Sequence, residues 1–233
     1  MDYCGTELEV FAEARRWKSY FRDWMFPYLG RNVLEVGAGF GATTAVLSAG
    51  PRRDWLCLEP NPSLLARLAG RIQRGELPDH IKARGGTIED LDPGFGFDTI
   101  LYIDVLEHIR DDRSEITRAA RRLDRGGRLI LLSPAFPILA SAFDEAIGHY
   151  RRYTRATIHA LTPGTCRLVR LAYLDSVGAA ASLANRLLLR QGSPSGREIL
   201  FWDRTMIPLS KILDPVLGRF WGRSILGVWE RRR

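Results

Sequence analysis

The sequence has few cysteines, few lysines and no long apolar run, and each shortage removes a class of protein. The three cysteines, Cys4, Cys57 and Cys166, are an odd number without a CxxC spacing, so neither a disulfide framework nor a zinc site is indicated. Charged residues interrupt every apolar run well short of the roughly 20 residues that span a bilayer. No signal peptide opens the chain. We therefore expect a cytoplasmic protein with reduced thiols.

The excess of basic residues is almost entirely arginine. The formal net charge is +7, but only Lys18, Lys82 and Lys211 are lysine, and the arginines are scattered over the whole chain. Proteins that bind nucleic acid usually gather their positive charge into one stripe. A coding bias toward arginine explains the composition better. We expect a small-molecule substrate and no nucleic-acid partner, in a monomer or a homodimer.

The alternation of apolar runs and helix-like segments indicates an α/β fold. With 233 residues, 45% of them apolar, the chain suits a single domain over residues 1–233. A helical lead-in is expected within residues 1–30, and then a doubly wound, mostly parallel sheet. The expected strands are Val33–Val36, Trp55–Leu58, Ile81–Arg84, Thr99–Ile103, Arg128–Leu132, Leu168–Tyr173 and Ser224–Trp229. The expected helices are Gly41–Ala49, Pro62–Arg74, Asp112–Leu123 and Thr154–Leu161.

Residues 174–223 break this alternation. The segment is dense in aromatic, aliphatic and proline residues, and it is too long to be a simple connection between two strands. We expect a helical insertion before the last strand. Its aromatic side chains would form a lid over a hydrophobic substrate, a dimer face or plain core packing; they are Phe201, Trp202, Phe220 and Trp221. Contact of Leu183–Arg190 with a membrane surface is a less favoured alternative.

The stretch "NVLEVGAGFGA" (residues 32–42) carries the first functional signal. A buried strand delivers Glu35 to the carboxyl edge of the sheet, and Gly37, Gly39 and Gly41 then allow a tight turn into a helix. Taken alone, this pattern fits a dinucleotide as well, or a turn that binds nothing.

The next strand narrows the choice of ligand. "WLCLEPNP" ends on Glu59, where a carboxylate can accept hydrogen bonds from ribose hydroxyls. Glu35 lies inside the motif, where it would meet a cationic amino group. Gly41 comes one residue early for dinucleotide spacing. A ligand with a ribose and a charged amino-acid tail would use both acids.

Four motifs in order resemble those of class I S-adenosylmethionine-dependent methyltransferases. They are "LEVGAGFG", "LEP", "FDTILYIDVLEHIRDD" and "LDRGGRLILLSPA", within residues 30–175. "FDEAIGHYRRYTRATI" resembles a substrate-facing loop of the small-molecule subset of that family. The resemblance implies a seven-stranded sheet with an antiparallel last strand, and S-adenosylmethionine as the cofactor.

The resemblance also implies roles for individual residues. Glu35 and the glycine turn would bind the methionine portion of the cofactor, and Glu59 would bind its ribose. The segment "GGTIEDL" would contact the adenine. The residues after the fourth strand would lie near the sulfonium. Thr87 departs from the aspartate often found at its position. The implied cofactor-binding residues are Glu35, Gly37, Ala38, Gly39, Gly41, Glu59, Pro60, Thr87, Ile88, Asp104 and Val105.

Methyl transfer to a hydroxyl needs a base, and histidine is the natural one at neutral pH. The candidate catalytic residues are His108, His149 and Asp104. His108 is otherwise a structural hydrogen-bonding residue, and His149 otherwise anchors its loop to Asp144. Glu107 and His108 are adjacent, but no partner motif downstream is evident, so we expect no metal site.

The loop "GHYRRYT" supplies the candidate substrate-binding residues. An arginine fork there can hold a substrate carboxylate or phosphate, or it can pair with acids of the loop itself. The tyrosines can wall an apolar pocket or fix the following helix. The candidates are Asp144, His149, Tyr150, Arg152 and Tyr153.

The sequence thus predicts a methyltransferase that acts on a small or lipid-like molecule, with oxygen preferred over nitrogen or carbon as the acceptor. Three alternatives remain open. They are a protein that binds S-adenosylmethionine and catalyses a different reaction or none, an oxidoreductase with a nicotinamide cofactor, and an enzyme that modifies RNA.

Overall fold

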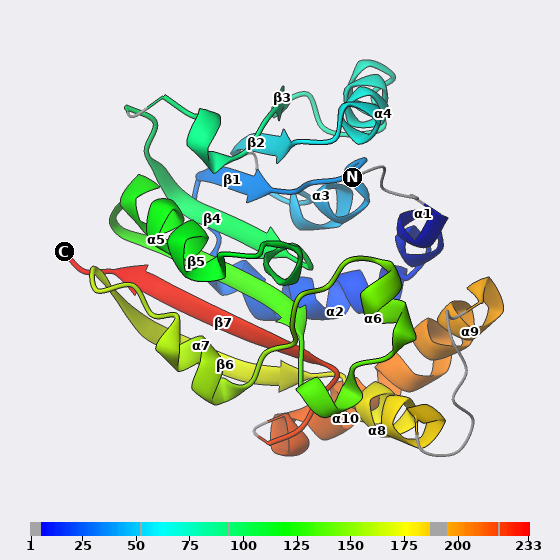
Figure 1. The fold of residues 1–233 in the computed structure, drawn as a ribbon. Helices are drawn as coiled ribbons and strands as arrows, with labels where there is room; N and C mark the ends of the chain where they lie inside the picture. Colours follow the sequence, from blue (N-terminus) through cyan, green and yellow to red (C-terminus); the bar gives the residue numbers. More distant parts are fainter. Residues whose placement is uncertain (1–5, 52, 93, 187–194, 219) are drawn as a thin grey trace.

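Seven strands, one for each expected apolar run, form a single sheet in the computed structural model, which describes residues 6–51, 53–92, 94–186, 195–218 and 220–233 (Figure 1). The strand order is β3-β2-β1-β4-β5-β7-β6. β7 runs antiparallel to β5 and β6, and the other pairs are parallel. The expected antiparallel last strand is confirmed. The strands are β1 Asn32–Val36, β2 Asp54–Glu59, β3 Ile81–Gly85, β4 Phe97–Ile103, β5 Leu123–Pro134, β6 Cys166–Leu174 and β7 Ser224–Arg231.

Helices connect these strands where the sequence pattern places them. The four expected helices are found as α3 Ala42–Leu47, α4 Pro62–Gln73, α5 Asp112–Arg122 and α7 Arg155–Ala160. The start of the described chain folds as two helices and a 3₁₀ turn, which are α1 Thr6–Ala12, α2 Arg15–Met25 and η1 Phe26–Tyr28. Further short elements are η2 Ile88–Asp90, η3 Leu106–His108, η4 Pro137–Leu139 and α6 Ala142–Ala146.

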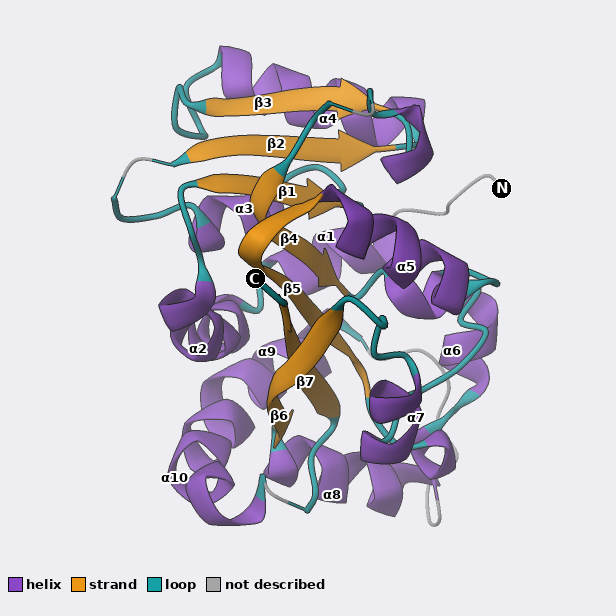
Figure 2. Ribbon diagram, turned by 90° about the vertical axis from the view of Figure 1, so that its left-hand side faces the viewer, coloured by secondary structure: helices purple, strands orange, loops and turns teal. Residues whose placement is uncertain are grey.

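The sheet separates two apolar layers because alternate side chains of a strand point to opposite faces. Leu34 and Leu58 pack on one face with residues of α5 and α7. Val33 and Cys57 pack on the other face with residues of α2 and α3. Figure 2 shows α2 and α3 on one side of the sheet and α5 and α7 on the other. By the same alternation, Glu35 faces α2.

Between β6 and β7 the chain forms α8 Ser176–Ala184, α9 Gly196–Phe201, the π-helical turn η6 Trp202–Met206 and α10 Ile207–Leu217. Of these, α8 and α10 lie at the β6 end of the sheet, at the bottom of both ribbon views, and α9 lies near α1 at the right of Figure 1 (Figures 1 and 2). Half of the suggested membrane-contacting stretch Leu183–Arg190, namely residues 187–190, lies outside the described residues. No helix in the described part of the chain is long and apolar enough to cross a membrane.

Buried carboxylates tie these helices to the rest of the molecule. Asp214 of α10 accepts hydrogen bonds from the Tyr20 hydroxyl (2.7 Å) and from the backbone N–H groups of Asp175 (2.6 Å) and Ser176 (3.0 Å). Asp203 accepts one from the backbone N–H of Trp17 (2.8 Å). Buried acceptors of this kind fix the position of their donors because a lost bond leaves a polar group unsatisfied.

Replacing Asp214 by alanine should lower the free energy of unfolding by about 3 kcal/mol or more, because three buried donors lose their acceptor. The measurement is urea unfolding followed by circular dichroism. Asp23→Ala is the matched control, since Asp23 joins the same two helices through an exposed ion pair with Lys211. It should cost less than about 1 kcal/mol. Equal losses in the two variants would contradict the anchoring role of Asp214.

Candidate active site

The turn that follows β1 is built from left-handed glycines. Gly37, Gly39 and Gly41 have φ angles of +68°, +58° and +82°. A Cβ at Gly37 would fall 2.6 Å from a methyl carbon of Val105, so a larger residue would clash there in addition to being strained. The backbone N–H of Gly37 donates to the Leu58 carbonyl of β2 (2.8 Å). The turn is therefore fixed against the neighbouring strand.

The carboxylate of Glu59 stabilises this turn through hydrogen bonds. It accepts hydrogen bonds from the backbone N–H groups of Gly39 and Asn61, both at 2.8 Å. Burial raises the pKa of Glu59, and these two bonds oppose the rise. The side chain is only 5% exposed, so its visible task is to hold the glycine turn in shape. Contact with a ribose stays a prediction.

A cavity of about 210 Å³, here called the central cavity, opens at the carboxyl ends of β1 and β4. This is where the strand order reverses and where open α/β sheets bind ligands. The glycine turn forms one wall and the loop of residues 141–152 another. The helices α1 and α2 close it with side chains that the sequence analysis did not assign to the site, namely Leu8, Phe11, Trp17, Lys18 and Phe21. The sequence indicated that these residues lie on helices, but it did not show which part of the protein the helices would pack against.

Glu35 projects into this cavity from the middle of the molecule. Its Oε2 accepts a hydrogen bond from the indole N–H of Trp55 (2.8 Å) and a weaker one from the Cys57 thiol (3.9 Å). Burial raises the pKa of the Glu35 carboxyl to about 7, although these hydrogen bonds oppose the shift. A cationic group in the cavity would stabilise the ionised carboxylate.

Lys18 and Asp104 face the same space. Burial lowers the pKa of Lys18 to about 8, and the negative charge of Asp104 opposes this shift. Asp104 is an exposed residue that borders the cavity, and it has a φ angle of +52°, which is unusual for a residue other than glycine. Loss of hydration raises the pKa of Asp104 to about 6, and the positive charge of Lys18 is among the causes that limit the rise.

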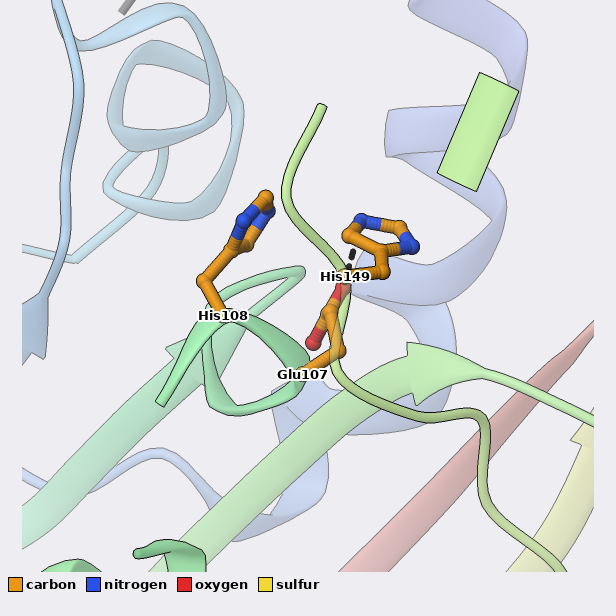
Figure 3. Close-up of side chains that lie close together, drawn as sticks. All are labelled: Glu107, His108 and His149. Atoms are coloured by element: carbon orange, nitrogen blue, oxygen red, sulfur yellow. Dashed lines mark ion pairs between the residues drawn. The ribbon is translucent and has the colours of Figure 1, made fainter. Parts of the chain in front are cut away.

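Glu107, His108 and His149 meet at one end of the cavity (Figure 3). The two imidazole rings are 4.6 Å apart at their centroids, in an edge-to-face arrangement. Nε2 of His149 lies 3.9 Å from Oε1 of Glu107. Burial raises the pKa of Glu107 well above its usual range, and burial also lowers the pKa of His108 to about 4. His108 is therefore neutral at pH 7. The sequence analysis found no downstream partner motif for Glu107 and His108; in the structure, His149 lies beside both of them.

Asp144 organises the loop that carries His149. Its carboxylate bonds Nδ1 of His149 (2.9 Å) and is held by Nε and Nη2 of Arg152 (2.7 and 3.0 Å). Burial opposes ionisation, but these hydrogen bonds keep the pKa of Asp144 well below its usual range. Of the two roles considered for the arginine fork, Arg152 pairs with the loop acid. Arg151 pairs instead with Asp112 (2.6 Å).

Other residues singled out in the sequence lie away from the cavity wall. Tyr150 is half exposed, and Tyr153 is buried with its hydroxyl donating to Asp112 (2.9 Å). Ile88 is packed in the core, and Thr87 bonds Asp90 at the start of η2. Several cofactor candidates are likewise absent from the wall, namely Gly41, Glu59, Pro60, Thr87, Ile88 and Val105. Their contacts with a cofactor stay predictions.

Of the aromatic residues singled out in the 174–223 segment, one borders the cavity and three lie elsewhere. Trp202 borders the cavity, and the guanidinium of Arg223 lies 4.9 Å from the centre of its ring. Trp221 packs against Phe136, with the ring centroids 4.9 Å apart. Phe201 and Phe220 are exposed to solvent. A lid role for the whole segment stays a prediction.

A family model described as a methyltransferase domain matches residues 34–129. A tRNA U34 carboxymethyltransferase from Shewanella amazonensis is 33% identical over 108 residues, which are 45% of this chain and 32% of that protein. A ubiquinone biosynthesis O-methyltransferase from Dechloromonas aromatica is 28% identical over 144 residues, 54% of this chain and 61% of that protein. The first of these relatives is named as a tRNA-modifying enzyme, which is at odds with the expectation that this chain has no nucleic-acid partner.

Among solved structures, a geranyl diphosphate C-methyltransferase from Streptomyces coelicolor, in complex with Mg²⁺, geranyl diphosphate and S-adenosyl-L-homocysteine, is similar with a TM-score of 0.65. It is 13% identical, and the match covers 99% of this chain and 84% of that one. This likeness shows the fold. The matches to tRNA U34 carboxymethyltransferases span between 32% and 38% of the length of those proteins.

Replacing Glu35 by glutamine should change stability in a pH-dependent way. The folded-state pKa of about 7 lies above the ordinary value of 4.5, so ionisation of Glu35 costs folding free energy. The cost is nearly absent below about pH 4, grows as the pH rises toward 7 and is complete above it. Glu35→Gln should match the wild type near pH 4 and exceed its unfolding free energy by about 3 kcal/mol at pH 8. The measurement is urea unfolding at both pH values. A difference that does not vary with pH would contradict it.

Proposed function

We propose that this chain, which belongs to the class I S-adenosylmethionine-dependent methyltransferases, transfers the methyl group of that cofactor to a hydroxyl oxygen of a small or lipid-like molecule. The methyltransferase model and the seven-stranded fold confirm the expected family and its cofactor. The observation that carries the proposal is one cavity that joins the glycine turn to the His149 cluster. Cofactor and acceptor would meet inside it.

The charges of the cavity suit the two ends of the cofactor's methionine portion. The carboxylate of Glu35 would bind its ammonium group, which favours the ionised form of Glu35. Lys18, which also borders the cavity, would bind its carboxylate. Asp104 would face the positive sulfonium. The glycine turn lets the backbone approach the ligand closely because it carries no side chains at these positions.

The chemistry asked of this chain is positioning and proton removal. When bound, S-adenosylmethionine supplies a methyl group that is displaced from sulfur to the acceptor oxygen, and neutral S-adenosylhomocysteine is left. His149 is the group placed to take the hydroxyl proton. Its Nδ1 faces Asp144, so that Nδ1 carries the hydrogen and Nε2 offers its lone pair to the cavity. Asp144 and Arg152 hold the imidazole in this orientation.

The shape and lining of the cavity favour an apolar acceptor. Phe11, Phe143, Ile147 and Trp202 line it beside the charged groups. Such walls exclude water from the reacting atoms and suit an aromatic or lipid-like alcohol. The name of the Dechloromonas relative, an O-methyltransferase, supports oxygen as the acceptor.

Binding of the cofactor is tested by calorimetric titration with S-adenosylmethionine, S-adenosylhomocysteine and NADH. We expect the two sulfur ligands to bind and NADH not to bind. Gly37→Ala should abolish binding, because the new Cβ would strike Val105. Gly75→Ala is the matched control. Gly75 has nearly the same φ angle, +69°, but has nothing within 4 Å of the added carbon and is remote from the cavity. Binding of NADH alone would overturn the proposal.

Methyl transfer is tested with radiolabelled S-adenosylmethionine against three acceptor classes: phenols and lipid alcohols, amines, and bulk tRNA. We expect label in the hydroxyl compounds. His149→Gln should lower kcat by roughly 10²-fold or more, as expected for loss of a base, and leave the affinity for S-adenosylhomocysteine unchanged. Label in tRNA would favour the RNA alternative. Tight cofactor binding without transfer to any class would favour the non-methylating alternative.

A further inference from the structure

We infer that Glu107, His108 and His149 form a binding site for a divalent transition-metal ion at the end of the central cavity. The site itself stands on the geometry of these side chains, while its chemical role rests on the proposed methyl transfer. It replaces the sequence-based expectation of a site without metal.

The three side chains come from two segments of the chain that converge on one point. Glu107 and His108 belong to the η3 turn after β4, and His149 belongs to the loop after α6 (Figure 3). One ligand atom from each lies within 4.8 Å of the others. Bonds of about 2.0–2.2 Å to a shared ion would bring such atoms to roughly 3–4 Å from one another. The distance of 3.9 Å between His149 Nε2 and Glu107 Oε1 is already in this range.

Glu107 is the strongest sign that the site takes a cation. The residue has 0% exposure, and its Oε2 accepts a hydrogen bond from the Ser133 hydroxyl (2.9 Å). Its Oε1 accepts no hydrogen bond from any residue that the structure describes. Figure 3 shows the carboxylate directed toward His149. A buried carboxylate oxygen without a donor is rare in folded proteins unless an ion or a ligand completes it.

Neighbouring groups orient the three side chains through hydrogen bonds, as is usual for the ligands of a metal ion. Nδ1 of His149 bonds the carboxylate of Asp144, which Arg152 fixes in turn. In metal sites, a ligating histidine usually donates its second ring N–H to a carboxylate or a carbonyl. His108 interacts with the backbone of Ile147 and Gly148. Each of the three side chains therefore has a partner that orients it.

Two imidazoles and one carboxylate select the type of ion. Nitrogen ligands suit Mn²⁺, Fe²⁺, Co²⁺ and Zn²⁺ better than Mg²⁺ or Ca²⁺, which prefer oxygen alone. Three protein ligands leave coordination positions open on the cavity side. The acceptor hydroxyl would bind there through its oxygen. With the ion bound, Nε2 of His149 would be a ligand and no longer the base. The cation would instead lower the pKa of that hydroxyl, so that its proton would leave to water and the oxygen lone pair would form the bond to the methyl carbon.

The test begins with titration of Mn²⁺ into the full chain after treatment with EDTA, with free Mn²⁺ followed by electron paramagnetic resonance. We expect one saturable site per chain. His108→Ala, His149→Ala and Glu107→Gln should each weaken binding by about 10–100-fold or more. The control is His159→Ala, which removes an exposed histidine of α7 and should leave binding unchanged. No saturable binding of Mn²⁺, or equal binding in all variants, would overturn the inference.

A second measurement needs only the wild-type protein and therefore survives variants that do not fold. The chain has four histidines. Zn²⁺ titration observed by ¹⁵N NMR of the imidazoles should shift the signals of His108 and His149 and leave those of His80 and His159 in place. Shifts at His80 or His159 alone would sink the inference. Methyl transfer at full rate without any bound ion would leave the proposed function standing, with His149 as the base. Ion binding without methyl transfer would leave the metal site standing alone.

Discussion

The central constraint on this molecule is the negative charge buried where the parallel strands end. Four carboxylates border the central cavity, Glu35, Asp104, Glu107 and Asp144, and three basic side chains border it as well, Lys18, Arg152 and Arg223. Carboxylates in a low-dielectric space either take up protons or require a positive partner. Asp144 has its partner in Arg152. The raised pKa values of Glu35, Asp104 and Glu107 show that these three lack full compensation. A ligand that brings positive charge is therefore what the cavity is built to receive.

The same cavity couples ligand binding to the packing of distant segments. Trp17 and Lys18 form its roof, and the backbone of Trp17 is held by Asp203, which follows directly on Trp202 in the chain. The rings of Trp17 and Trp202 also contact each other, with centroids 5.7 Å apart. Because α2 and the helices after β6 position these residues together, loosening either one would open the ligand site before the sheet itself unfolds.

The sheet could be predicted from the sequence because its signal is local. Short apolar runs separated by helix-like segments gave all seven strands, and the glycines after β1 marked the ligand edge. The partners of the polar side chains could not be predicted in this way. His149 and Glu107 are 42 positions apart, and no periodicity sets their contact. From the sequence, a substrate and an acid of its own loop were equally plausible binding partners for Arg152. The three-dimensional structure shows that it pairs with the loop acid Asp144. The closure of the central cavity by α1 and α2 could not be predicted either, because it also depends on contacts between distant segments.

The chemistry at the end of the cavity follows from the charge constraint. A hydroxyl that loses its proton beside Asp104 and Glu107 would add a further negative charge to a space that already holds too many. The proposed transfer to a hydroxyl would therefore need positive charge to remain near the oxygen. Transfer of the proton to His149 would do this, because the imidazolium would stay within the cavity and Asp144 would stabilise it. The proposed divalent ion among Glu107, His108 and His149 would do it more fully, because it would also compensate the unpaired oxygen of Glu107. Glu107 by itself is poorly suited to be the base, because burial raises the pKa of its carboxyl well above its usual range.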